Sequence, residues 1–543
     1  MRRSIAILLI TISLVLSGCF GKKSTNEEVK EVSISPAGEL PIVDEKVTLK
    51  VLVQSRANIE NFGTNEFTKW YEEQTNVHID WEVVPPKDAQ EKLNLILTSG
   101  EYPDVIMGFG ISPTMQMVYG MQGVFRPMND YIDKYGYGTK RLFEEVEGAE
   151  EAIKAPDGNI YGLPQIDANP HTASPQKLWI YEPWLKKLNL DMPTTTEEFY
   201  QVLKAFKTQD PNGNGKADEI PLAGATTGWH AQIDNFLMNA FIYTHKLGNG
   251  YTILDNGKVD VVFNKPEWKK GLEFLHKLYD EGLLAPETFT QDIDQLRRLG
   301  ENPDVPILGV APGGTMEFTQ IGGESGRWQE YVTIPPLKGP DQLQVAPYSL
   351  EGLNANAQFV ITSAAKYPEV AYRWGEMMYT EEITIRNDNG TLGEHWDWAE
   401  EGEIGLNGKQ GSWKKLVQPS GIQNFEWEHT GPILQTRELR EGLVTQKGEL
   451  AQILYEETVK NYDPYRQDVD KIVPPLFFSE SQASELATLE KTIRDYVNEM
   501  LARFVTGDAD ISKEWDKYLD TLENMNLKRF VEIYQEAYDA KYK

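Results

Sequence analysis

Alternation of apolar and polar residues predicts two β-strands early in the chain, over residues 47–53 and 77–84. Between them, aromatic residues recur at helical spacing within residues 65–75, and leucines indicate a short helix over residues 88–99. An apolar run at residues 104–107 predicts a buried strand. This order of strands and helices is typical of a parallel, helix-covered sheet, which binds ligands in loops at the carboxyl ends of its strands.

The rest of the chain continues to alternate and ends in a long helical tail. Short apolar runs predict strands, and amphipathic stretches predict helices. We expect Thr194 to cap a helix, because its hydroxyl can accept a hydrogen bond from the first turn. The predicted strands cover residues 178–181, 259–263, 305–310 and 359–362, and the predicted helices cover residues 196–207, 267–281, 370–379 and most of 484–542.

The first residues predict export. Arg2 and Arg3 precede an apolar run over residues 4–16, which is too short for a membrane span of ~20 residues and fits a signal peptide. Small residues directly before Cys19 resemble the lipobox of bacterial lipoproteins, in which the cysteine is lipidated. We therefore expect a signal peptide over residues 1–18, a lipidated Cys19 and a flexible tether to residue 42, on the extracellular face of a Gram-positive type membrane. The alternative is an ordinary signal peptide with an incidental cysteine.

Composition narrows the function further. The chain has 543 residues and a net charge of −30, so that its surface repels phosphate backbones and a nucleic-acid partner is not expected. It has one cysteine, which excludes an internal disulfide and a thiolate metal site. No two histidines have the spacing of a helical zinc site, and nucleotide-binding glycine motifs and a GxSxG motif are absent from the sequence.

Ordered segments of the chain resemble the extracellular solute-binding proteins of ABC importers. The length and the helical tail are similar to the large subfamily of oligosaccharide-binding lipoproteins that includes the alginate-binding proteins. The resemblance implies an oligosaccharide ligand, ABC permease partners, hinge closure and no covalent chemistry. The segments that carry it are residues 81–108, 161–165, 178–199, 274–284, 359–380 and 530–542.

The resemblance also implies the fold. It is an α/β, two-lobe periplasmic-binding-protein-like fold of type II, with parallel-rich sheets covered by helices, a ligand cleft between the lobes and a helical C-terminal tail. We expect the first lobe to comprise residues 43–163 and 344–390, and the second lobe to comprise residues 164–343 and 391–543.

A loop after the predicted helix at residues 196–207 has the spacing of an EF-hand calcium loop. Oxygen-bearing side chains stand at positions 1, 3, 5 and 9, a glycine stands at position 6, and position 7 offers a carbonyl. Position 12 is Pro221 instead of glutamate, and Glu219 at position 10 could supply the missing carboxylate. The alginate-binding relatives bind calcium in such a loop, which supports a structural calcium ion; the alternative is a pair of turns without an ion. The expected ligands are Asp210, Asn212, Asn214, Lys216 (through its carbonyl), Asp218 and Glu219.

Sugars stack on aromatic rings and accept hydrogen bonds from planar side chains, so residues of these types at strand ends and crossovers are the candidates for binding. Several candidates have a structural alternative: a surface loop for residues 54–56, a core position for Phe109 and the tryptophans, and a hydrogen-bonded structural role for His230. Thr315 follows a Gly-Gly turn where many relatives carry an aromatic residue. The candidate ligand-binding residues are Gln54, Ser55, Arg56, Phe109, Gln165, Asp167, Asn169, Trp229, His230, Thr315, Glu394, Trp396, Trp398 and Trp427.

We interpret the chain as a membrane-anchored, monomeric binding component of a carbohydrate importer rather than an enzyme. A cell-surface glycoside hydrolase or polysaccharide lyase is the alternative, because carboxylates are plentiful. A sensor that binds sugar without transport is a third reading. The charge of the sugar stays open at this point, since Arg56 and His230 are the only cationic residues among the candidates.

Overall fold

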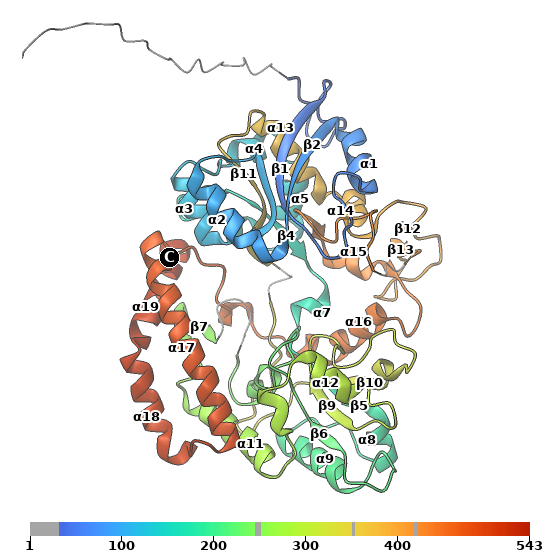
Figure 1. The fold of residues 1–543 in the computed structure, drawn as a ribbon, viewed down its shortest axis with the longest axis vertical. Helices are drawn as coiled ribbons and strands as arrows, with labels where there is room; N and C mark the ends of the chain where they lie inside the picture. Colours follow the sequence, from blue (N-terminus) through green and yellow to red (C-terminus); the bar gives the residue numbers. More distant parts are fainter. Residues whose placement is uncertain (1–31, 245–250, 350–352, 418–420) are drawn as a thin grey trace, which may run out of the picture.

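The computed structural model describes residues 32–244, 251–349, 353–417 and 421–543. Figure 1 shows two lobes, one above the other, that the chain connects by crossing between them several times. The predicted signal peptide and Cys19 lie outside the described residues. Among the described residues, no helix combines the length and the apolar character needed to cross a membrane.

The first lobe is built on a six-stranded sheet in the order β14-β4-β11-β3-β1-β2. β1 pairs in parallel with both β2 and β3, as the order of strands and helices predicts, whereas β11 runs antiparallel to β3 and β4. Its strands are β1 (Val47–Gln54), β2 (Val77–Val84), β3 (Val105–Ile111), β4 (Leu163–Asp167), β11 (Leu353–Ile361) and β14 (Leu434–Gln435). Its helices are α1 (Glu66–Thr75), α2 (Ala89–Ser99), α3 (Pro113–Met121), α4 (Asn129–Tyr135), α5 (Gly138–Glu145), α6 (Ala149–Ile153), α13 (Pro368–Glu376) and α14 (Glu381–Asn389).

The second lobe has a four-stranded sheet in the order β10-β5-β9-β6, in which only β6 and β9 are parallel. The N-cap of α9 is Thr195 rather than Thr194, because Thr195 and Glu198 form a reciprocal capping box. The strands are β5 (Leu178–Tyr181), β6 (Ile220–Leu222), β9 (Leu308–Pro312) and β10 (Tyr331–Ile334), with a hairpin of β7 (Thr252–Asp255) and β8 (Lys258–Val261). The helices are α8 (Glu182–Leu188), α9 (Thr196–Thr208), α10 (Asp234–Leu237), α11 (Pro266–Asp280), α12 (Ile293–Gly300) and α16 (Leu450–Asn461).

The boundaries of the lobes differ from the expected ones in several places. Residues 164–167, expected in the second lobe, belong to β4 of the first-lobe sheet, because β4 pairs with β11 and β14. Residues 34–42 do not behave as a tether: Ile34 bridges Val43, and Ile42 is buried against the first lobe, because its side chain is apolar and its amide bonds Thr75. Residues 391–435 do not join the second lobe, since β14 pairs with β4. A small separate sheet is made of β12 (Trp396–Trp398), β13 (Trp413–Lys415) and β15 (Leu443–Val444). The helix α15 (Arg437–Glu441) comes directly before β15 in the chain.

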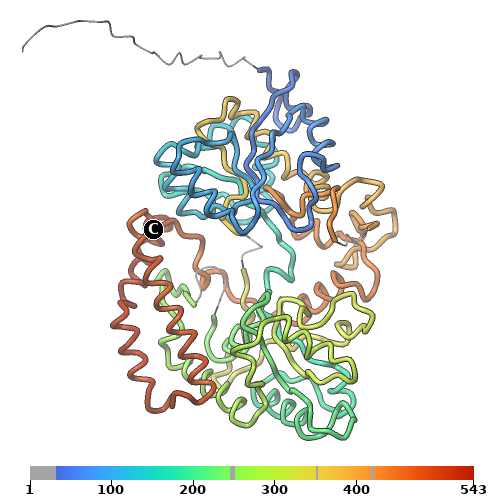
Figure 2. Tube along the Cα trace, in the orientation of Figure 1, coloured from blue at the N-terminus to red at the C-terminus, as the bar shows by residue number. Residues whose placement is uncertain are grey.

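The helical tail forms α17 (Glu480–Thr506), α18 (Ile511–Asn524) and α19 (Leu527–Tyr542), which stand along one side of the molecule (Figure 2). α17 packs on α11 of the second lobe, and α19 packs on β8. The start of this unit also reaches the first lobe: Phe477 is buried in a first-lobe cluster, and the amide of Phe478 donates to the Thr114 hydroxyl on α3. The tail therefore contacts both lobes.

Candidate functional site

The first crossover, from β4 to β5, brings polar side chains from distant segments together. It contains the short helix α7 (Pro170–Ala173), which Asn169 caps by accepting a hydrogen bond from His171 N–H. Asp167, at the end of β4, forms an ion pair with Arg440 of α15, with Nε and Oδ1 3.2 Å apart. Gln165 lies half-buried on the same strand. The predicted residues at this crossover thus share one region, and Arg440 is an addition that sequence reasoning missed.

Trp229 lies against this crossover from the second lobe. Its half-buried ring meets the edge of the His171 ring, with centroids 5.4 Å apart. Its backbone N–H donates to a carboxylate oxygen of Glu317 at 3.3 Å, and its carbonyl accepts from Gly314 N–H. A Cβ on Gly314 would overlap the indole, so glycine at this position leaves the room that the ring needs. Thr315 follows on the same turn, half-buried.

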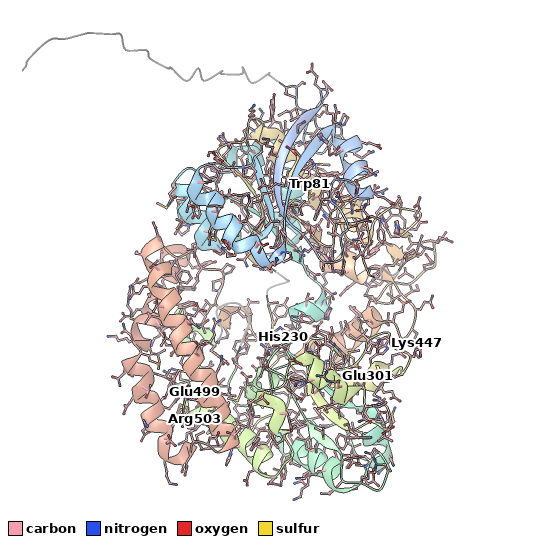
Figure 3. The ribbon with its side chains drawn as sticks, viewed as in Figure 1. Trp81, His230, Glu301, Lys447, Glu499 and Arg503 are labelled. Carbon is pink, nitrogen blue, oxygen red and sulfur yellow. The ribbon has the colours of Figure 1, made fainter. Side chains whose placement is uncertain are left out.

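A cavity of about 500 Å³ opens beside Trp229 and His230, within the ~300–1,000 Å³ range of small-molecule sites. His230 lies at the end of the second lobe that faces the first lobe (Figure 3). The cavity combines apolar walls with carboxylate, amide and hydroxyl groups, the combination that recognises polyhydroxylated ligands. Besides Trp229 and His230, its lining includes Thr226, Gln232, Ile233, Asp234, Asn235, Thr288, Phe289, Asn498, Leu501 and Ala502.

The first lobe presents the ends of β1 and β3. Gln54, Ser55 and Arg56 are half-buried there, and the Ser55 amide extends the sheet by bonding Val84 O. Arg56 donates from Nε to the hydroxyl of Thr430 at 3.4 Å. Phe109 on β3 is half-buried and packs against a first-lobe cluster, which fits the structural alternative for this residue.

A pair formed by His429 and Asp388 lies beside these strand ends and was missing from the predicted site. His429 Nε2 lies 2.6 Å from Asp388 Oδ1, and both Glu428 and His429 have a left-handed backbone, with φ of 49° and 58°. Such strain in side chains with a Cβ persists only where the surroundings enforce it, and it concentrates at ligand-binding positions. Glu426 is buried nearby; burial, and then the charge of Asp388, raise the pKa of its carboxyl to about 8. Only the tertiary fold shows this group, because its members have no motif spacing.

Two predicted platforms are wrong. Trp427 is fully buried in the first-lobe core, where its ring packs edge-on against Phe67 and its Nε1 donates to the Thr68 hydroxyl at 2.8 Å. Trp396 is also fully buried, in the core of the small sheet, with Nε1 donating to Gly390 O. A ring without exposed surface cannot stack on a sugar. Trp398, in contrast, is 38% exposed and lies edge-on to Trp396.

Glu394 is placed away from the cavity residues, in an exposed group with Glu66 and His395 whose ligand atoms lie within 4.8 Å of one another. His395 Nδ1 accepts a hydrogen bond from Thr391 N–H, and the ring stacks on Phe425 at 3.8 Å. The proton of the neutral ring is therefore on Nε2, and neither nitrogen has a lone pair left for a metal ion.

The loop over residues 210–219 closes on itself through its own oxygen atoms. The Asp210 carboxylate accepts from the N–H groups of Gly213, Asn214 and Gly215. The Asp218 carboxylate accepts from the side-chain amides of Asn212 and Asn214, which lowers its pKa. Burial, together with the charges of Asp210 and Asp218, raises the pKa of Glu219. Side chains at positions 1, 3, 5 and 9 thus converge, and the position 7 carbonyl belongs to Lys216.

Comparison with known proteins shows the family to which the chain belongs. Residues 54–385 match the family model for bacterial extracellular solute-binding proteins. The chain belongs to this family. This solute-binding protein is 30% identical to the fructooligosaccharide ABC transporter substrate-binding protein FusA of Streptococcus pneumoniae, over 98% of this chain and 97% of that protein. It is 23% identical to the polygalacturonan/rhamnogalacturonan-binding protein YtcQ of Bacillus subtilis, over 98% of both chains.

Solved structures agree with this assignment. FusA in complex with fructo-nystose has a TM-score of 0.69 and 28% identity, covering 91% of this chain and 99% of that one. An ABC-transporter-associated solute-binding protein of Bifidobacterium longum infantis, described as "HMO binding", has a TM-score of 0.77 at 24% identity, covering 92% of this chain and 100% of that one, and supports the fold alone. This solute-binding protein is therefore the binding component of an ABC importer and not an enzyme. It has the two-lobe fold.

Proposed function

We propose that this solute-binding protein captures a neutral oligosaccharide in the cleft beside the crossovers and delivers it to its permease. The cavity next to Trp229 supports this proposal most directly. Its aromatic wall offers a stacking surface, and its carboxylate and amide groups offer partners for hydroxyls. Trp229 lies against the crossover from the first lobe, where a hinge movement would bring the two lobes onto one ligand.

The charges around the cavity favour a neutral sugar over an acidic one. Among the described residues that line it, Asp234 contributes a carboxylate and none is lysine or arginine. A second carboxylate, that of Glu317, lies on the backbone N–H of Trp229. A uronic acid in this place would bring its own carboxylate close to two like charges, and the net charge of −30 adds to the repulsion.

Fructo-oligosaccharides are the first class to test, because FusA is the relative with 30% identity over nearly the whole chain. The experiment is isothermal titration of the chain from residue 24 onward with kestose and nystose, and with oligogalacturonides of matched length. We expect heat of binding with the neutral series, and the intact sugar to be recovered afterwards. Binding of oligogalacturonides alone would contradict the proposed charge preference, and cleavage of the sugar would contradict a pure binding role.

We further propose that the loop over residues 210–219 binds a structural calcium ion. The convergence of the Asp210, Asn212, Asn214 and Asp218 side chains fits a cation that prefers six to eight oxygen ligands. Glu219 would complete the set, since its carboxylate lies beside the loop, 3.5 Å from Asn212 N. A solved structure of FusA is described as an EF-hand mutant, and one of the alginate-binding protein AlgQ2 is described as lacking its calcium ion.

The anchoring and the assembly of the protein complete the proposal. Cys19 would carry the lipid, hold the protein on the extracellular face of the membrane and leave the folded part, from about residue 34, within reach of the permease subunits. The Bacillus subtilis lipoprotein LipO, 26% identical over 52% of this chain, supports this placement. We expect a monomer, because after lipidation the sequence contains no further cysteine for a cross-link.

A further inference from the structure

The cavity beside Trp229 has one wall from the C-terminal helical unit. Asn498, Leu501 and Ala502 of α17 line it. They are three and four residues apart, so they share one face of the helix. The other walls come from the loop after β6 and from residues 288–289. The helical tail is therefore part of the site rather than a separate appendage.

α17 is held firmly enough to act as a wall. A capping box at Ser479 begins the helix, and its buried side chains pack on the second lobe. Just before it, Phe477 is buried in the first lobe and the Phe478 amide bonds Thr114. A helix of 27 residues is about 40 Å long, so α17 extends from the first lobe along the second lobe beside the cavity.

Asn498 carries the polar chemistry of this wall. The Tyr251 hydroxyl lies 3.3 Å from Asn498 Oδ1 and 3.1 Å from Asp234 Oδ2, so that it joins the helix to the opposite wall. Among the described residues, Asn498 Nδ2 has no hydrogen-bond partner, and the residue is exposed at the cavity. Next to it, the buried Leu501 and the half-buried Ala502 give this part of the cavity an apolar lining. An amide donor beside an apolar patch matches the alternation of hydroxyl and C–H surface on a sugar ring.

We propose that α17 forms a terminal subsite, in which Asn498 donates to a sugar hydroxyl and Leu501 and Ala502 limit how far the oligosaccharide extends. The subsite would take the last unit of a neutral chain, so that it sets the chain length that the protein prefers. This proposal rests on the proposed function, since it assumes an oligosaccharide beside Trp229.

The test uses the full soluble chain and a ladder of fructo-oligosaccharides from two to six units. Affinities are measured for the unaltered protein, for Ala502→Trp, which fills the subsite, and for Asn498→Ala, which removes only the amide. Glu499→Trp is the matched control, because Glu499 is exposed on α17 and does not line the cavity (Figure 3). Thermal unfolding of each unliganded variant shows that it is folded.

We expect the unaltered protein and Glu499→Trp to bind more tightly as the chain lengthens, up to a limit. In Ala502→Trp the gain from the last unit should disappear, a loss of about tenfold or more, and Asn498→Ala should lose about three- to tenfold for the same ligands only. If Ala502→Trp and Asn498→Ala both showed the same dependence of affinity on chain length as the unaltered protein and the Glu499→Trp control, the subsite would be overturned. The proposed function would remain intact. Failure of the unaltered protein to bind any of the sugars would overturn the proposed function and the subsite together.

Discussion

His429 and Asp388 form a close pair, 2.6 Å between Nε2 and Oδ1, that joins a strained loop to the end of α14. Burial by itself would raise the pKa of Asp388, but the charge and the hydrogen bond of His429 more than offset it, so that the pKa lies well below its ordinary value. The next residue, Thr430, accepts from Arg56 at the end of β1. The pair thus fixes the loop that positions one predicted cleft residue.

Replacing the buried carboxylate should destabilise the protein. We expect Asp388→Asn to lower the free energy of unfolding at pH 7 by about 1–3 kcal/mol, because His429 loses its charged partner. The folded-state pKa of Asp388 is depressed, so its contribution is present above pH ~4 and is lost as the pH falls through the folded-state value. The decline therefore begins as the pH falls below ~4, and urea unfolding between pH 3 and pH 7 measures its onset. Asp495→Asn, at an exposed position, is the control; equal losses in both variants would contradict the role of the pair.

Trp229 beside the cavity and Trp398 on the small sheet are both partly exposed, so substituting each of them tests which of the two regions binds the sugar. We expect Trp229→Ala to weaken oligosaccharide binding by about 1–2 kcal/mol, roughly five- to thirtyfold, because a stacking surface is lost. Trp398→Ala should leave the affinity unchanged, since Trp398 lies on β12 against Trp396 and is not among the residues that line the cavity. Titration calorimetry of both variants measures this. A loss of affinity in Trp398→Ala would extend the site to the small sheet.

Trp427 should matter for stability instead of recognition. Trp427→Ala leaves a large cavity among Phe67, Trp81 and Trp374, and removes the bond to Thr68, so we expect a loss of about 3–5 kcal/mol. Trp427→Phe keeps most of the volume and should lose clearly less. Denaturant unfolding gives both values, and a sugar titration of Trp427→Phe should match the unaltered protein. A weakened titration without a change in stability would return Trp427 to the binding surface.

Periodicity predicted the regular elements well where they bury one face. The strand expected at residues 47–53 is β1, the helix expected at 65–75 is α1, and the tail is helical as predicted. The two-residue strand β14 was beyond reach, because Leu434 and Gln435 show no period and pair with β4 across more than 250 residues of sequence. The assignment of residues 391–435 to the second lobe failed for that reason.

Candidate residues at strand ends lie beside the cavity, whereas two of the isolated tryptophans are core residues. Trp229 and His230 follow β6 and line the cavity, and Asp167 ends β4, positions that a sheet imposes on its loops. Whether a Trp is core or surface depends on neighbours that are distant in sequence: Thr68 satisfies Trp427 Nε1 and Gly390 satisfies Trp396 Nε1. His429 and Asp388 are 41 residues apart and have no shared motif. Residue type alone could therefore not sort these positions.

Calcium should stabilise the folded protein through the loop over residues 210–219. At a hundred times its dissociation constant, an ion that binds only the folded state adds about 2.7 kcal/mol, which thermal unfolding with calcium or a chelator detects. We expect Asp218→Asn to lose most of this difference, because Asp218 gathers the side chains of Asn212 and Asn214. Asp191→Asn, outside the loop and exposed, should keep it. An unaltered protein that unfolds at the same temperature with calcium and with chelator would contradict a calcium site.

Lys177 links the first crossover to Tyr462, the residue that follows α16. Its ammonium group donates to the carbonyl of His171 at 3.0 Å and to that of Ser174, and it lies 5.3 Å from the centre of the Tyr462 ring. The residue is fully buried, and burial lowers its pKa to about 7, against an ordinary value of 10.5. Between these two values the unfolded chain binds more protons than the folded one, so stability contributed by this group rises with pH.

This sign gives a measurable difference between the unaltered protein and Lys177→Met, which keeps the length of the side chain and removes the titration. From pH 7 to pH 9 the unaltered protein should gain stability relative to the variant, by up to about 2 kcal/mol, because each pH unit contributes at most about 1.4 kcal/mol per proton. Urea unfolding of both proteins at pH 7, 8 and 9 gives the difference at each pH, and groups that both proteins share cancel. Lys186→Met, at a position with a 70% exposed side chain, should show no such trend. A difference that stays constant from pH 7 to pH 9 would mean that Lys177 keeps its proton through this range, held by the α7 carbonyls and the Tyr462 ring.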